Sequence, residues 1–363
     1  MDSLTQIALG SAVGVAAMGR RTAVWKAALW GGLCGTLPDL DALIDHGDPI
    51  RNMTLHRTES HSLFFLTLLA PAVAGVIAAI HRDRLFRRWW LAVWLVLITH
   101  PLLDLMTVYG TQLGLPFTDF PYYVGSIFII DPLYTLPLMA GVALALARGE
   151  AGLRWNRVGL TVSTVYLAWS VGAQFHVTNV ATAALARGGV VVERLLVTPT
   201  AFNTVLWRIV AMTPDGYVEG FHSLFDADDR IPFTVHPNDR SLALRQAQDW
   251  HVARLVWFSH GFFGADPVAG GLRIRDLRMG QEPTYTFSFV LPRPAGPGLP
   301  STPPSVGAPS TASAGVSAAP APALPRQLPM QIDVAAALSW LWQRLLGNRI
   351  PPLGAPPDAP NSN

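Results

Sequence analysis

Residues 56–80 read HRTESHSLFFLTLLAPAVAGVIAAI, in which two histidines, an arginine and a glutamate stand directly before a long apolar run. The run from residue 63 to residue 80 is long enough to cross the hydrocarbon core of a bilayer, about 30 Å thick, as a helix. The polar residues at its start therefore lie at one face of the membrane. This stretch predicts a helical membrane protein with a polar site where the chain enters the bilayer.

The composition of the whole chain agrees with a membrane protein. Half of the 363 residues are hydrophobic, 14% are charged, and the mean hydropathy is +0.32. These values are too apolar for a soluble domain of this length. The formal net charge is only +2 and the basic residues are scattered over short loops, so nucleic acid is not an expected partner. Cys34, the single cysteine, has no second thiol in the chain with which to form a disulfide.

Apolar runs recur along the first 177 residues and predict an all-α polytopic membrane domain of about six helices. The first run is followed, not preceded, by Arg20 and Arg21, which is the reverse of a cleavable signal peptide. We therefore expect it to be retained as a short or tilted helix. The six runs cover residues 4–18, 23–44, 62–80, 89–107, 127–147 and 158–176.

Arginines between the runs predict the orientation of the helices. Three connecting segments, residues 19–26, 81–88 and 148–157, are rich in arginine and lysine, whereas residues 45–61 and 108–126 hold only Arg51 and Arg57. By the positive-inside rule the first three face the cytoplasm and the other two face outward. Six crossings then place everything after residue 177 on the outer side.

The second half of the chain predicts a small α+β extracytoplasmic domain over residues 178–291. The segment VLWRIVAMTPDGYVEGFHSLF (205–225) is typical of a β-hairpin, because Pro214 and Gly216 suit a tight turn. An amphipathic helix is expected at 242–258 and two closing strands at 272–278 and 284–291. Residues 292–328 have the composition of a disordered Pro/Ala/Ser-rich linker. A last amphipathic helix, within 329–348, is expected to dock on the body or to lie at the membrane interface.

Carboxylates and imidazoles gather at the outer ends of the predicted helices. Such residues are costly inside a membrane, so their clustering on one side indicates function. His100 and Asp104 are four apart and share a helix face. Imidazole nitrogen with carboxylate oxygen is a ligand set for zinc, and also for manganese or iron. We expect a divalent metal, zinc first, with one to three ions. The residues concerned are Asp39, Asp41, Asp45, His56, His61, His100, Asp104 and Asp131.

Several of these residues also have a purely structural interpretation. His100 alone would serve as a hydrogen-bonded packing residue, and Asp39 with Asp41 would simply solvate a helix end. His56 alone would be an ordinary loop histidine. Asp131 precedes Pro132 and would cap a helix, since Asp is favoured at the N-cap and Pro at the first helical position. Only the shared location favours the joint functional interpretation.

Three motifs in order resemble the YdjM-like family of inner-membrane metal-dependent hydrolases. They are LPDLD (37–41), HRTESHSL (56–63) and THPLLDLMTVYGTQLGLPF (99–117), and the resemblance covers about residues 1–145. That family tends to open with Met-Asp-x-x-Thr-His, whereas this chain opens MDSLTQ, with Gln6 at the position of the histidine. The resemblance implies hydrolase activity and a distant likeness to zinc-dependent phospholipase C, in which a helical bundle holds metal ions that cleave phosphoesters.

The first functional hypothesis is therefore a multi-pass metal-dependent hydrolase of the bacterial inner membrane, acting on a lipid or lipid-linked (phospho)ester at the outer leaflet. Arg57 would bind a substrate phosphate, His56 would be a ligand or support one, and Asp131 would be a ligand or orient a ligand histidine. A carboxylate left free of metal would be the general base, and Asp39 is a candidate both for a catalytic role and for a metal ligand. The expected metal ligands are Asp39, Asp41, His61, His100 and Asp104.

Two other classes of function fit the same sequence. Intramembrane carboxylates and histidines also mark ion pathways, so a proton- or ion-coupled transporter is the second hypothesis. A non-catalytic membrane scaffold, which binds through the outer domain and the last helix, is the third.

Overall fold

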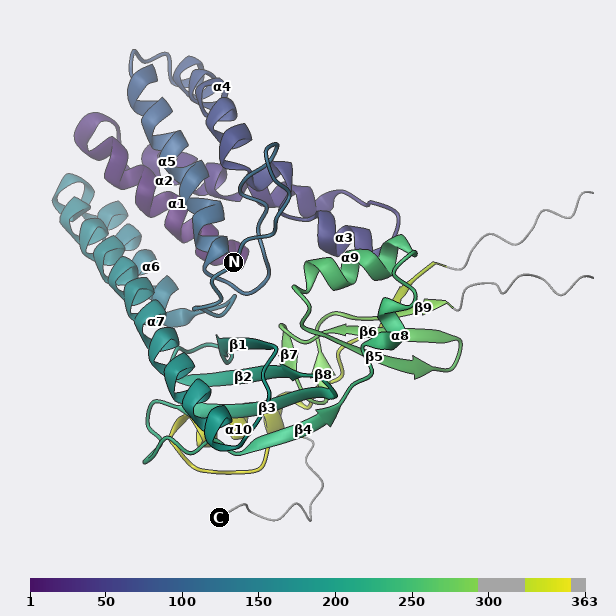
Figure 1. Cartoon of the computed structure of the whole chain (residues 1–363). Coiled ribbons are helices and arrows are strands. Elements are labelled where there is room, and N and C mark those ends of the chain that lie inside the picture. The colour runs from purple at the N-terminus through teal and green to yellow at the C-terminus, as the bar shows by residue number, and fades with distance from the viewer. Residues whose placement is uncertain (293–323, 354–363) are drawn as a thin grey trace, which may run out of the picture.

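The computed structural model describes residues 1–292 and 324–353, which form a helical N-terminal part and a sheet-containing C-terminal part (Figure 1). Most of the predicted linker, residues 292–328, lies outside the described residues. The boundary predicted at residue 177 falls within a helix that continues to Arg187.

Each of the six apolar runs forms a helix. The six helices are α1 (Ser3–Met18), α2 (Val24–Thr36), α4 (Leu63–His81), α5 (Phe86–Leu105), α6 (Pro132–Arg148) and α7 (Leu153–Arg187). Two helical stretches are long and apolar enough to cross a membrane, namely Leu63–His81 and Pro132–Arg187, the second of which joins α6 to α7. The helical N-terminal region is thus confirmed, while the number of membrane crossings stays a prediction.

Short helical turns connect the long helices at both ends of the helical part. The run 23–44 breaks after Thr36, because Pro38 has no N–H with which to continue the α-helical bonding. The connecting turns are η1 (Gly19–Arg21), η2 (Pro38–Leu43), α3 (Pro49–Leu55), η3 (Glu59–His61) and η4 (Gly149–Gly152). Of these, α3 was not predicted from the sequence; it begins where Asp48 accepts hydrogen bonds from the N–H groups of Ile50 and Arg51.

Helices α1 and α2 pack with their backbones in contact. A Cβ atom at Gly10 would lie 2.3 Å from the carbonyl oxygen of Gly31, and one at Gly35 would lie 2.7 Å from that of Gln6. Small residues allow this approach in membrane helix pairs. The contact fixes the start of α1, which carries Gln6, against the end of α2, which leads into η2.

The arginine-rich turns lie together at one end of the helical part. Figure 1 shows the turns α1–α2, α4–α5 and α6–α7 at the end far from the sheets. Arg20 in the first of these turns pairs with Glu150 in the third at 3.3 Å, in an exposed position. The start of α1 and the end of α5 lie at the opposite end, towards the sheets (Figure 1).

The C-terminal part contains two four-stranded antiparallel sheets. The first has the order β1 (Arg194–Pro199), β2 (Leu206–Thr213), β3 (Gly216–Ser223) and β4 (Phe233–Pro237). Its central hairpin pairs Thr213 with Gly216 across a two-residue turn, as the sequence predicts. One face of this sheet is covered by the last turns of α7, where Val177 and Ala181 pack against Trp207 and Ile209.

The second sheet has the order β10 (Arg326–Gln327), β9 (Ser288–Pro292), β6 (Gly271–Asp276) and β5 (Phe263–Val268), and a small hairpin joins β7 (Gly280–Gln281) to β8 (Thr284–Tyr285). The two predicted closing strands pair as β6 and β9. The single helix predicted at 242–258 is wrong: it is divided into α8 (Ser241–Leu244) and α9 (Trp250–Phe258). Asp249 caps α9 by accepting hydrogen bonds from two backbone N–H groups, so a new helix begins there.

Packing between α3 and α9 joins the two parts of the chain. Ile50 and Met53 share a core with Phe258 and Tyr109. The guanidinium of Arg278 donates hydrogen bonds to the carbonyl oxygens of Val108 and Tyr109, both at 3.2 Å. The sheets are therefore attached to the loops that carry the polar motifs.

The last helix, α10 (Val334–Leu345), docks on the first sheet, one of the two locations expected for it. The ring of Trp340 packs edge-on against Phe221. Arg344 forms a two-pronged ion pair with Asp226, with both N–O distances 2.6 Å. This buried pair is the main polar attachment of α10.

Acid should release α10. Burial favours the neutral form of Asp226, but hydrogen bonds from His222 and Arg344 outweigh it and lower the pKa of Asp226 to about 2. The unfolded value is about 3.9, so the attachment is fully present above about pH 4 and is lost as the pH falls towards 2. We expect limited proteolysis with an acid-active protease to cut near α10 at pH 2.5 much faster than at pH 4.5. Asp226→Asn should remove this pH step; an unchanged step would contradict the assignment.

Candidate metal centre

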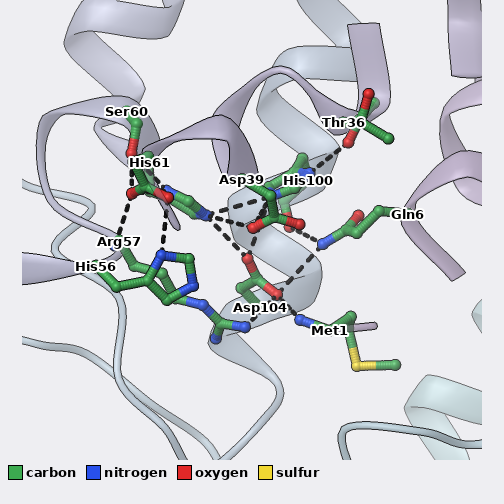
Figure 2. A network of polar contacts seen from close by, with 12 residues as sticks. Met1, Gln6, Thr36, Asp39, His56, Arg57, Ser60, His61, His100 and Asp104 are labelled. Carbon is green, nitrogen blue, oxygen red and sulfur yellow. Dashed lines mark hydrogen bonds and ion pairs between the residues drawn. The ribbon is translucent and has the colours of Figure 1, made fainter. Parts of the chain in front are cut away.

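Four side chains from three separate segments converge at the polar end of the helical part (Figure 2). Asp39 comes from η2 and His61 from η3, whereas His100 and Asp104 lie one turn apart on α5. His61, His100 and Asp104 are each no more than 1% exposed. Asp39 is the most accessible of the four, with 19% of its side chain exposed.

The donor atoms of these residues lie close together. They are Asp39 Oδ1, His61 Nε2, His100 Nε2 and Asp104 Oδ2. Five separations among them lie between 3.2 and 3.4 Å, and all four atoms lie within 4.8 Å of one another. Two ligands about 2.0–2.1 Å from a tetrahedral zinc ion lie about 3.3 Å apart, so these five separations suit such an ion.

Hydrogen bonds to the outer nitrogens leave both inner imidazole nitrogens free of a proton. His100 Nδ1 lies 2.7 Å from the carbonyl oxygen of Gly35, which can only accept, so Nδ1 carries the hydrogen. His61 Nδ1 lies 2.8 Å from Ser60 Oγ, which in turn donates to Asp41 Oδ2 at 2.5 Å. This is the arrangement by which metal-bound histidines are oriented.

Converging lone pairs make the centre unfavourable without a cation. Two unprotonated imidazole nitrogens and two carboxylate oxygens point at one another, and Asp104 Oδ2 is buried without a hydrogen-bond partner. Four acceptors that share no hydrogen repel each other, and a buried orphan oxygen costs about 1–3 kcal/mol. A divalent ion at the centre would satisfy all four, so the residues present fit a metal.

The second oxygen of Asp104 is held by positive and polar groups. Arg57 contacts Oδ1 at 3.2 Å and the amide of Gln6 donates to it at 3.2 Å. The amino group of Met1 also contacts this oxygen (Figure 2). Oδ1 therefore points away from the centre and Oδ2 towards it, with Gln6 orienting the carboxylate.

Asp41 and His56, which sequence motifs place beside the ligands, lie outside the group of four. Asp41 Oδ1 binds His56 Nδ1 at 2.7 Å, and Oδ2 accepts from the backbone N–H of Arg57 and from Ser60. Both oxygens are thus occupied in positioning neighbours, and His61 Nδ1 is 3.6 Å away. Asp41 was expected to be a metal ligand. In the structure its carboxylate faces the outer side of the His61 ring.

Arg57 is fixed in an unusual conformation at the edge of the centre. Its φ is +64°, a left-handed value that is uncommon for a residue with a side chain. The guanidinium lies 4.8 Å from the centre of the Tyr109 ring, and its Nε atom is buried without a partner. A free donor on a buried cation beside a metal site suits an anionic oxygen of a ligand.

The hydrogen bonds of Asp131 are made with residues outside the centre. It accepts hydrogen bonds from the backbone N–H groups of Leu133 and Tyr134 and from the hydroxyl of Tyr166, at 2.8 Å. Among the contacts described for residues 1–292 and 324–353, none joins Asp131 to the four donors. Its observed role is the helix cap that Asp-Pro sequences favour.

Three residues that support the centre were not singled out from the sequence. These residues are Ser60, Gly35 and Tyr109. Of the three, only Ser60 could have been suspected from the sequence, because it is adjacent to His61.

The fold and the centre define a helical membrane protein with a buried histidine–aspartate group that can hold a metal ion. Residues 1–177 match the family model described as YdjM inner membrane protein. The motif resemblance is thereby confirmed, and the family supports a location in the bacterial inner membrane.

One curated relative extends the similarity beyond the helical part. The chain is 23% identical over 305 residues to the uncharacterized protein YfhP of Bacillus subtilis (strain 168), covering 80% of this chain and 90% of that protein. Because that coverage exceeds 177 residues, it includes much of the sheet-containing part. No solved structure matches the chain.

Proposed function

We propose that this protein is a metal-dependent hydrolase that cleaves a lipid or lipid-linked phosphoester at the outer leaflet of the inner membrane. The observation that carries the proposal is the convergence of four donor atoms, from Asp39, His61, His100 and Asp104, five of whose separations lie between 3.2 and 3.4 Å. Two nitrogens and two oxygens at this spacing favour zinc over the octahedral oxygen sites of magnesium or manganese. Asp41 is proposed to orient these ligands, not to bind the metal.

Each residue around the centre has a proposed part in the reaction. A divalent ion held by Asp39, His61, His100 and Asp104 would polarise a phosphoryl oxygen and would supply hydroxide at neutral pH. Arg57, with its free buried Nε, would bind another phosphate oxygen. Asp39, the most accessible of the four, contacts the two imidazoles through Oδ1, which would leave Oδ2 to accept a proton from water.

The proposed membrane arrangement has six crossings and an extracytoplasmic C-terminal part. The arginine-rich turns lie together at the end of the helices far from the sheets (Figure 1), and arginine-rich loops face the cytoplasm. The metal centre and the sheets then share the outer side. A transporter would need polar groups along the path through the bilayer, so the gathering of the donors at one end favours the hydrolase.

Removing the metal tests the proposal directly. We expect chain purified in mild detergent to contain about one zinc, manganese or iron ion, and to release phosphate or phosphomonoester from mixed phospholipid micelles. Dialysis against EDTA should abolish the release, and added Zn²⁺ should restore it. Arg57→Met should retain the metal but lose activity, since a buried cation that binds phosphate is removed. Active protein without metal, or metal-loaded protein inert towards all phosphoesters, would refute the proposal.

A further inference from the structure

A pocket of about 480 Å³ lies beside the metal centre and has no assigned role. One wall consists of the segment from η2 through α3, which contributes Asp45, Asp48 and Asn52. The other wall comes from the C-terminal part, through Phe287 and Gln327. The pocket therefore lies between the two parts of the chain, where binding sites commonly occur.

Two residues link this pocket to the centre. His56 lines the pocket, and its ring lies 5.7 Å from that of His61 and its Nδ1 atom 2.7 Å from Asp41. Tyr109 also lines the pocket, and its ring carries the Arg57 guanidinium at 4.8 Å. A molecule with one group at the metal and Arg57 would thus extend its next group into the pocket.

The charges that line the pocket are negative. Asp48 is already paired with Arg51 and His251, at 3.1 and 3.3 Å. Asp45 accepts hydrogen bonds at Oδ1 from the N–H of Gly47 and from Asn52, and no cation pairs with it among the described residues. The described lining contains no lysine or arginine. This lining suits a cation.

Apolar side chains stand exposed next to the pocket. Leu43 is 82% exposed and Leu40 51% exposed, and both lie on η2, the segment that carries Asp39. Ile44, which is 55% exposed, lines the pocket itself. An acyl chain would lie along these residues while a polar group entered the pocket, so the surroundings match an amphipathic molecule.

We infer that this pocket binds the headgroup of a phospholipid and selects one that ends in an ammonium group. The phosphate would lie at Arg57 and the metal, and the ammonium group at the free carboxylate oxygen of Asp45. That the bound lipid is a substrate rests on the proposed function. Binding of the headgroup itself needs no catalysis.

The test uses full-length chain in detergent, with the metal removed so that hydrolysis does not interfere. Binding of glycerophosphoethanolamine, glycerophosphoglycerol and glycerophosphoserine is measured by saturation-transfer NMR titration. We expect the ethanolamine compound to bind most tightly. Asp45→Asn keeps the oxygen that accepts from Gly47 and removes the charge, so ethanolamine affinity should fall about fivefold, the strength of one ion pair near water. Binding of the glycerol compound should not change.

A control and a second variant complete the test. Asp239→Asn removes an exposed carboxylate elsewhere on the C-terminal part and should change nothing. Ile44→Arg adds a cation to the pocket wall and should make the serine compound bind better than the ethanolamine compound. Equal binding of the three compounds, or an ethanolamine affinity unaffected by Asp45→Asn, overturns the inference. Headgroup selectivity in a protein that hydrolyses no phosphoester would support the pocket and refute the hydrolase.

Discussion

His61→Ala is expected to empty the metal centre. His61 Nε2 lies 3.3 Å from the donor atoms of both Asp39 and Asp104 and 3.2 Å from that of His100. Its removal leaves three donors and opens a buried cavity to water. Loss of a residue that merely orients a ligand costs about 10- to 100-fold in metal affinity, so we expect loss of the ligand to cost more than 100-fold. Competition of the purified protein with a zinc-sensitive dye measures the affinity without any substrate.

Two further variants separate ligands from their supports. Asp41→Asn should weaken zinc binding only about 10- to 100-fold, because Asp41 acts through Ser60 and the outer side of His61. His176→Ala removes an exposed histidine on α7 and should leave the affinity unchanged. If Asp41→Asn were as damaging as His61→Ala, Asp41 would be a ligand, and an undiminished affinity in His61→Ala would exclude the centre altogether.

Arg208→Met is expected to destabilise the C-terminal part more than a substitution at an exposed position does. Arg208 is 3% exposed and donates to Glu219 Oε1 and to the carbonyl oxygen of Leu277, both at 2.6 Å. The bond to Leu277 connects the first sheet to the segment after β6. The substitution leaves the Glu219 carboxylate buried without its cation, which costs about 3–5 kcal/mol. Guanidinium unfolding followed by near-UV circular dichroism would measure the loss.

The cause of that loss is tested by removing both charges. Arg208→Met with Glu219→Gln should recover most of the stability, because no unpaired charge then remains inside the protein. Arg273→Met, at a partly exposed arginine that pairs with Asp266, should cost no more than about 1 kcal/mol. A single Arg208→Met variant as stable as the native chain would show that water or a rearranged side chain compensates Glu219.

The hydrophobic pattern predicted most of the helical part. A single long apolar run in a membrane can pair its own backbone N–H and C=O groups only as a helix. The same reasoning ended the last helix near residue 176, whereas α7 continues to Arg187. Beyond residue 176 the helix packs on a sheet, through Val177 and Ala181. That contact depends on strands that are distant in sequence, so local hydropathy does not report it.

The donors of the centre were partly accessible to sequence reasoning. His100 and Asp104, four apart on one helix, share a face by geometry alone. Asp39 and His61 followed from their position on the same side of the membrane. Asp41 was expected to be a ligand on the same grounds, and the structure places it outside the group of four. It lies two residues from Asp39 on a tight turn, where spacing alone does not decide which carboxylate faces inward. The distinction depends on the hydrogen bonds of Ser60 and His56, which only the folded chain brings together.

Gly35 connects the packing of two helices to the coordination chemistry. Its missing side chain lets α2 touch the backbone of Gln6, and its carbonyl oxygen fixes the proton of His100 on Nδ1. A methyl group at this position would push the carbonyl away and leave the imidazole free to change tautomer. Gly35 therefore helps to set the basicity of His100 through its backbone alone. A search of the sequence for reactive side chains does not find it.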